Sequence, residues 1–170
     1  MKKFVGIITL IGSLYGNSIS YNIEDTSNTY FRAIADVVFI GSDEIIGINK
    51  EVDGFVSLSN DKIESGKIII NSIGFNTQNN TRDKHIQEIL NVSQYPEISF
   101  LINRHYQKEN QDYLEGILKI NGIEKKQIIP IKIINEINRI SIQGKVNVKY
   151  EDFNIKTPSM GKYIKKSKEE

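Results

Sequence analysis

Residues Arg139–Tyr150 alternate apolar and polar side chains without interruption, with Gly144 as the one glycine on the apolar side. A period of two predicts a long strand with one dry and one solvated face, which is typical of antiparallel sheets. At ~3.4 Å per residue the strand is about 40 Å long, more than a small sandwich requires. Gly144 predicts a bend on the dry face. This strand therefore favours a curled, barrel-like sheet.

Further strand signals occur at hairpin spacing along the chain. The Asn121-Gly122 pair between two apolar runs predicts a tight hairpin turn. Together with Arg139–Tyr150, the signals predict an all-β, antiparallel, eight-stranded up-and-down β-barrel. The other seven predicted strands are Asn28–Ala35, Val37–Ile48, Glu51–Leu58, Gly66–Phe75, Glu97–Tyr106, Tyr113–Ile120 and Gln127–Asn135.

One segment departs from the period of two. Between Ser72 and Phe100, the apolar residues Ile86, Ile89 and Leu90 follow the i, i+3, i+4 spacing of a helix. Asn80 or Thr81 is the expected N-cap, Asp83 lies in the first turn, and Pro96 follows the end. The sequence therefore predicts one short helix over Asn80–Leu90.

The N-terminus has the order of a secretory signal peptide. Lys2 and Lys3 precede an apolar run over Phe4–Tyr15, and the small residues of Ser18–Ser20 follow. The run is shorter than the roughly 20 residues that span a bilayer. We expect a signal peptide over residues 1–20, a barrel domain over residues 21–156 and a lysine-rich tail over residues 157–170. The alternative is an N-terminal core strand, which the glycines of this segment disfavour.

Charge and composition exclude several classes of function. Without Lys2 and Lys3 the formal net charge falls from +1 to −1, a balance that argues against a nucleic-acid partner. The chain contains no cysteine, so disulfides, thiolate metal sites and cysteine nucleophiles are excluded. We expect a soluble, periplasmic or secreted domain held together by its core, with at most transient contact with a membrane.

Five separated stretches resemble one known family. They are Asn76-Thr77, Thr81–Ile86, Tyr95–Phe100, Gly116–Lys125 and Tyr150–Ile155. In this order they are similar to the signature of the YceI-like polyisoprenoid-binding family, over residues 21 to about 155. The resemblance implies an extended, lipocalin-like barrel around an apolar channel. It also implies periplasmic binding of long-chain isoprenoids or similar amphiphiles, without catalysis in most members.

The chain departs from that family pattern at three points. No histidine stands near Ile34–Asp36, and the late motif has Tyr150 and Asn154 where the family has Arg and Gly. A lysine-rich end replaces the usual closing strand. The chain could therefore leave an edge strand that pairs with a second copy to form a homodimer.

The dry strand faces are the candidate ligand-binding surface. Their side chains have the periodicity to line one interior, either around a channel or packed solid. The candidate channel lining is Phe100, Ile102, Leu114, Leu118, Ile120, Ile140, Ile142, Val146 and Val148.

Arg82, Asp83 and His85 are the candidate polar motif. Arg82 could bind a ligand's phosphate through its forked donors, or the Arg82–Asp83 pair could fasten the helix to the barrel. His85 and His105 are far apart in sequence and lack clustered carboxylates, so we expect no metal site. The sequence has no Gly-x-Ser-x-Gly elbow and no Gly-rich phosphate loop, so we expect no catalytic group and no cofactor. His105 should face outwards if Phe100 and Ile102 face inwards.

The sequence thus predicts an exported, non-enzymatic protein that sequesters or carries a long-chain isoprenoid or similar amphiphile. A second hypothesis is a secreted stress-response or interaction module whose barrel is filled and binds no ligand. A third is a hydrolase that uses Arg82, Asp83 and His85.

Overall fold

The computed structural model describes residues 2–15, 18–23, 28–37, 41–59, 62–136 and 139–155. Within these ranges the chain forms ten strands, one α-helix and two short 3₁₀ helices. The strands are β1 (Lys2–Tyr15), β2 (Ser18–Ile23), β3 (Asn28–Val37), β4 (Gly41–Asn49), β5 (Val52–Ser59), β6 (Lys62–Asn71), β7 (Glu97–Lys108), β8 (Gln111–Ile120), β9 (Ile123–Glu136) and β10 (Arg139–Val148). The helices are η1 (Ser72–Gly74), α1 (Asn80–Ile89) and η2 (Glu151–Phe153).

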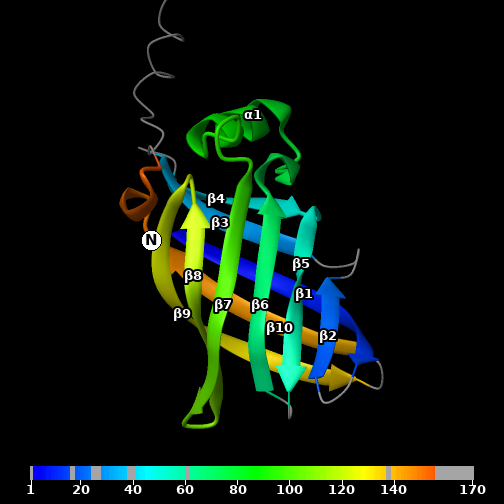
Figure 1. Ribbon diagram of the computed structural model, residues 1–170. Helices are drawn as coiled ribbons and strands as arrows, with labels where there is room; N and C mark the ends of the chain where they lie inside the picture. Colours follow the sequence, from blue (N-terminus) through cyan, green and yellow to red (C-terminus); the bar gives the residue numbers. More distant parts are fainter. Residues whose placement is uncertain are drawn as a thin grey trace, which may run out of the picture.

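All ten strands belong to one antiparallel sheet with the order β10-β9-β8-β7-β6-β5-β2-β1-β3-β4. β10 also pairs with β1, so the sheet curls back on itself. Figure 1 shows β6, β7 and β8 upright at the front, with β1, β3 and β10 crossing behind them and α1 above the ends of β6 and β7. The prediction of an antiparallel all-β protein with one short helix is confirmed.

The predicted number of eight strands is wrong. The eight expected strands correspond to β3–β10, and the two additional ones, β1 and β2, come from the N-terminal segment. β1 lies between two neighbours, because Phe4 is opposite both Val146 of β10 and Phe31 of β3. The segment expected to be a signal peptide therefore forms β1 and the start of β2 in this structure. Its cleavage before Tyr21 stays a prediction, and the predicted tail over residues 157–170 lies outside the described residues.

The Asn121-Gly122 turn and the N-terminal cap of the helix lie at or next to the predicted positions. Asn121 and Gly122 both have positive φ, 51° and 75°, and join β8 to β9 in the tight turn that this pair favours. α1 begins at Asn80, as expected, but its N-cap is the preceding residue, Asn79, whose side chain accepts hydrogen bonds from the backbone N–H groups of Thr81 and Arg82. A side-chain oxygen at this position satisfies two of the helix's unpaired donors.

The core lies inside the curled sheet. Among the side chains that the structure describes, the buried apolar ones come from β5 to β10, from Phe75 before α1, and from the segments that follow α1 and β10. No residue of α1 is itself buried, and Ile86 and Ile89 pack only partly against the core. The helix therefore rests on the end of the barrel and is not part of its interior.

Candidate functional site: an apolar cavity inside the sheet

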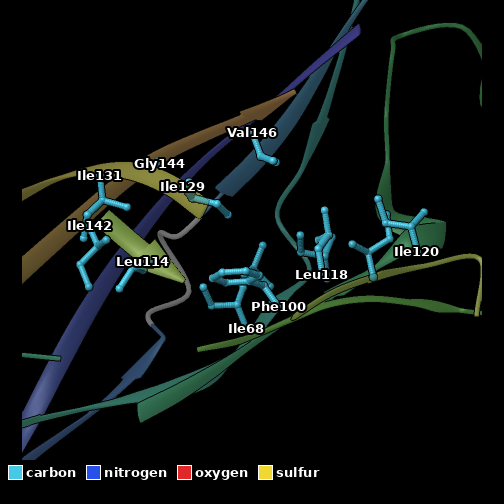
Figure 2. A pocket seen from close by; sticks show the side chains of 13 residues that line it. Ile68, Phe100, Leu114, Leu118, Ile120, Ile129, Ile131, Ile142, Gly144 and Val146 are labelled. Atoms are coloured by element: carbon cyan, nitrogen blue, oxygen red, sulfur yellow. The ribbon is translucent and has the colours of Figure 1, made fainter. Parts of the chain in front are cut away.

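A cavity of about 100 Å³ lies between the front strands and the strands behind them. Figure 2 shows Phe100 and Ile68 near its centre, with Ile131 and Ile142 at one end and Ile120 at the other. Every wall residue is apolar or glycine. The wall consists of Val52, Ile68, Ile70, Ile98, Phe100, Leu114, Leu118, Ile120, Ile129, Ile131, Ile142, Gly144 and Val146.

Most of the predicted lining residues lie on this wall. The structure brings Phe100, Leu114, Leu118, Ile120, Ile142 and Val146 together there. The other three belong to the same core away from the wall: Ile102 and Val148 are buried, and Ile140 packs partly against the core.

The predicted lining does not include Ile98 of β7 or the wall residues of β5, β6 and β9. Their strands were predicted, and the inward positions follow from register: Val52 is opposite Ile70, and Ile68 is opposite Phe100. Residues opposite each other in neighbouring strands point to the same face. The missing signal was therefore pairing, which a single sequence does not display.

Gly144 lies at the point where β10 separates from β9. Pairing between β9 and β10 ends at Gly144, whereas β10 continues beside β1 to Val148. The absent side chain also leaves room in the cavity, because a Cβ on Gly144 would lie 3.1 Å from Ile129 Cγ2 and 3.2 Å from Ile131 Cγ2.

Arg82 and Asp83, in the first turn of α1, form hydrogen bonds with Thr77, which lies in the loop before the helix. Arg82 Nε donates to Thr77 Oγ1 at 2.8 Å, and an Arg82 terminal nitrogen donates to the Thr77 carbonyl at 2.8 Å. Asp83 Oδ1 accepts from the Thr77 backbone N–H at 2.9 Å and from Thr77 Oγ1. Thr77 is buried, with 6% of its surface exposed. These contacts fasten the loop to the first turn of the helix.

We predict that Asp83→Ala loosens this loop. The variant leaves the buried Thr77 donors without an acceptor, which should lower the free energy of unfolding by about 1–3 kcal/mol. Hydrogen exchange should become faster in the Phe75–Val92 region, measured by mass spectrometry. Glu88→Ala is the matched control, because the Glu88 side chain is 76% exposed and only faces His85 Nδ1 at 3.6 Å. Equal protection in wild type and Asp83→Ala would contradict the fastening role.

The outward orientation predicted for His105 is wrong. The β7–β8 register shifts between Ile102 and Arg104, and such a bulge reverses which face the following residues occupy. The His105 side chain is 6% exposed, and its Nδ1 accepts from the Ile63 backbone N–H at 3.1 Å. Its Nε2 lies 3.0 Å from Asp112 Oδ1. His105 therefore ties β6, β7 and β8 together at the end far from α1.

His85 lies on α1, with its side chain 41% exposed. The structure does not bring His85 and His105 together, since they lie at opposite ends of the sheet. Within the described ranges no group of three or more histidine or acidic side chains could hold a metal ion. In the same part of the chain no helix is long and apolar enough to cross a membrane.

The late Tyr150–Ile155 stretch closes the space between β10 and the β8–β9 hairpin. Phe153 and Ile155 are buried, with 1% and 6% of their surfaces exposed. The Asn121 side chain donates to the Phe153 carbonyl at 3.1 Å. Asn154 has φ 50°, in the left-handed region that asparagine tolerates better than most residues, which is the position where the family has glycine. Burial raises the pKa of Tyr150 to about 12, so its phenol remains protonated at neutral pH.

Comparisons with known proteins agree on one family. A family model described as a YceI-like domain matches residues 21–168. A UPF0312 protein of Pectobacterium atrosepticum is 29% identical over 129 residues, covering 69% of this chain and 67% of that protein. Protein YceI of Shigella flexneri is 26% identical over 128 residues, with the same two coverages.

Solved structures show the same fold. BcnA of Burkholderia cenocepacia superposes with a TM-score of 0.63 and 13% identity, covering 90% of this chain and 82% of that one. The Campylobacter jejuni YceI protein gives a TM-score of 0.64 and 18% identity, covering 76% and 82%. The curled antiparallel sheet, the helix on its end and the match over residues 21–168 together place this chain in the YceI-like domain family.

Proposed function

We propose that this chain is an exported, non-enzymatic binding protein that holds the hydrocarbon part of an isoprenoid or similar amphiphile in the cavity. The observation that carries the proposal is the wholly apolar wall, built from six strands of one sheet. Each CH₂ group moved from water into such a site gains about 0.8 kcal/mol. A ligand without a hydrophobic segment would gain nothing from this wall.

The cavity volume limits how much of a ligand it holds. An engineered apolar cavity of about 150 Å³ binds benzene, and this cavity is about 100 Å³. It therefore accommodates a short end of a chain. A longer isoprenoid would have to extend out of the barrel or displace flexible wall side chains.

Export is supported by two independent features of the sequence. The N-terminal segment has the order of a signal peptide, and the family match begins at Tyr21, the residue after the proposed cleavage point. Cleavage would remove β1, the partner of β10 and β3. N-terminal sequencing of the protein from the periplasm tests the cleavage point.

The binding proposal is tested by native mass spectrometry of the protein purified from its own periplasm, before and after addition of geranylgeraniol. We expect a bound lipid or uptake of the added alcohol. Val146→Phe should reduce uptake because the ring fills the cavity, whereas Asn147→Phe, on the opposite and exposed face of β10, should not. Absence of any bound lipid together with no uptake would overturn the proposal.

The small cavity also favours a second candidate, an interaction module with a filled barrel. Such an interaction module would bind no lipid, and Val146→Phe would leave its binding to a protein partner unchanged. The hydrolase hypothesis has weaker support, because Arg82 and Asp83, in the first turn of α1, are hydrogen-bonded to Thr77 and fasten the loop that precedes the helix.

A further inference from the structure

Two polar residues interrupt the cavity-facing side of β9. By alternation Ile123, Lys125, Gln127 and Ile129 share one face of the strand, and Ile129 lies on the cavity wall. Ile123 also packs against the core. Lys125, which is exposed, and Gln127, which is half-buried, therefore lie between inward-facing isoleucines. The alternation of β9 predicts apolar side chains at both positions.

Register places both residues beside the cavity. Lys125 is opposite Leu118 of β8, and Leu118 is a wall residue. Gln127 is opposite Gly116 and is two positions from Ile129, so it lies between Lys125 and the wall. Residues directly opposite in an antiparallel pair have Cβ atoms about 4.5–5.5 Å apart. The stem of Lys125 thus begins at the rim of the apolar surface.

The same stretch of β9 has a free edge. Residues 123–130 pair with β8, while the pairing of β9 with β10 covers only residues 131–136. Among the described residues no strand pairs with the second edge of this stretch. β10 separates from β9 at Gly144, and η2 approaches β9 without pairing with this edge.

Lys125 differs from the neighbouring lysines in its charge environment. Lys126 binds Glu115 at 2.6 Å, a hydrogen bond that lowers the pKa of that carboxyl, and Lys119 lies 3.3 Å from Glu124. Lys125 has no carboxylate partner in the described part of the chain. Its ammonium group is the uncompensated positive charge of this cluster.

We propose that Lys125, supported by the Gln127 amide, binds an anionic head group of the amphiphile whose tail enters the cavity. This inference rests on the proposed function. The wall has no polar side chain, so a head group must remain at the rim to avoid the cost of burying it unpaired. An ammonium group donates charge-assisted hydrogen bonds to carboxylate or phosphate oxygens alike.

The test compares three probes with the same ten-carbon chain, namely 1-decanol, decanoate and decyl phosphate, by isothermal titration calorimetry on the full chain. We expect wild type to bind both anions about tenfold more tightly than decanol. Lys125→Gln should bring the anions within about twofold of decanol and leave decanol unchanged. A greater loss for decyl phosphate than for decanoate would identify phosphate as the preferred head group.

Lys126→Gln is the matched control, because it removes the same charge one residue away, on the opposite face of β9. It should keep the preference of wild type, and Lys125→Arg should keep it as well. Equal binding of decanol and the anions by wild type, or an unchanged preference in Lys125→Gln, overturns this inference and leaves the apolar cavity as a ligand site. Failure of all three probes to bind overturns both proposals.

Discussion

Replacing Phe100 with alanine is expected to lower the free energy of unfolding by about 3–5 kcal/mol. The ring is 6% exposed and lies on the cavity wall opposite Ile68 of β6 and Leu118 of β8. Its removal withdraws apolar contacts and enlarges a cavity that already exists. Urea denaturation followed by circular dichroism measures the loss.

The enlarged cavity should also become a better binding site. Benzene should raise the melting temperature of Phe100→Ala more than that of wild type, since a ligand that binds only the folded state stabilises it. Phe55→Ala is the matched control, because Phe55 is 46% exposed on β5. We expect it to cost less than about 1 kcal/mol and to gain no response to benzene. A similar cost for both variants would show that Phe100 does not line a packed interior.

The second large effect is expected at Gly116 of β8. A Cβ there would overlap the Leu101 carbonyl oxygen of β7 and lie 2.7 Å from Phe100 Cζ. The backbone oxygen cannot move without disturbing the β7–β8 ladder, so Gly116→Ala should cost about 2–3 kcal/mol. Thermal denaturation of the purified variant measures this loss.

Gly144→Ala is the comparison for that experiment. Its Cβ would lie 3.1 and 3.2 Å from methyl groups of Ile129 and Ile131, which can shift by a few tenths of an ångström, and at an ordinary contact distance of 3.7 Å from the Pro130 carbonyl oxygen. We expect a cost below about 1 kcal/mol. If the two variants were equally stable, the close approach of β7 and β8 at Gly116 would be contradicted.

Much of the fold could be predicted because local signals agree with it. The period of two in Arg139–Tyr150 and the Asn121-Gly122 turn needed only neighbouring residues, and the structure has β10 and the β8–β9 hairpin at these places. The same holds for the helix, where capping and Asp83 in the first turn depend on residues within one turn of each other.

Predictions that depended on continued alternation were less reliable. His105 was assigned to the outer face by counting from Ile102, and the bulge between Ile102 and Arg104 reverses that count. The N-terminal segment is the opposite case. Its glycines disfavour a strand, yet β1 lies in the sheet because it pairs with β10, β2 and β3.

Local patterns in the sequence predict which side chains alternate, where the turns and the helix begin, and that the interior is apolar. These properties depend on contacts between residues close in the chain. Only the tertiary structure decided which apolar residues share one cavity, that Arg82 and Asp83 bind Thr77, and that Lys125 stands at a free edge. Each of these depends on strand register and on the path of β10 past Gly144, which are set by pairing between residues distant in sequence.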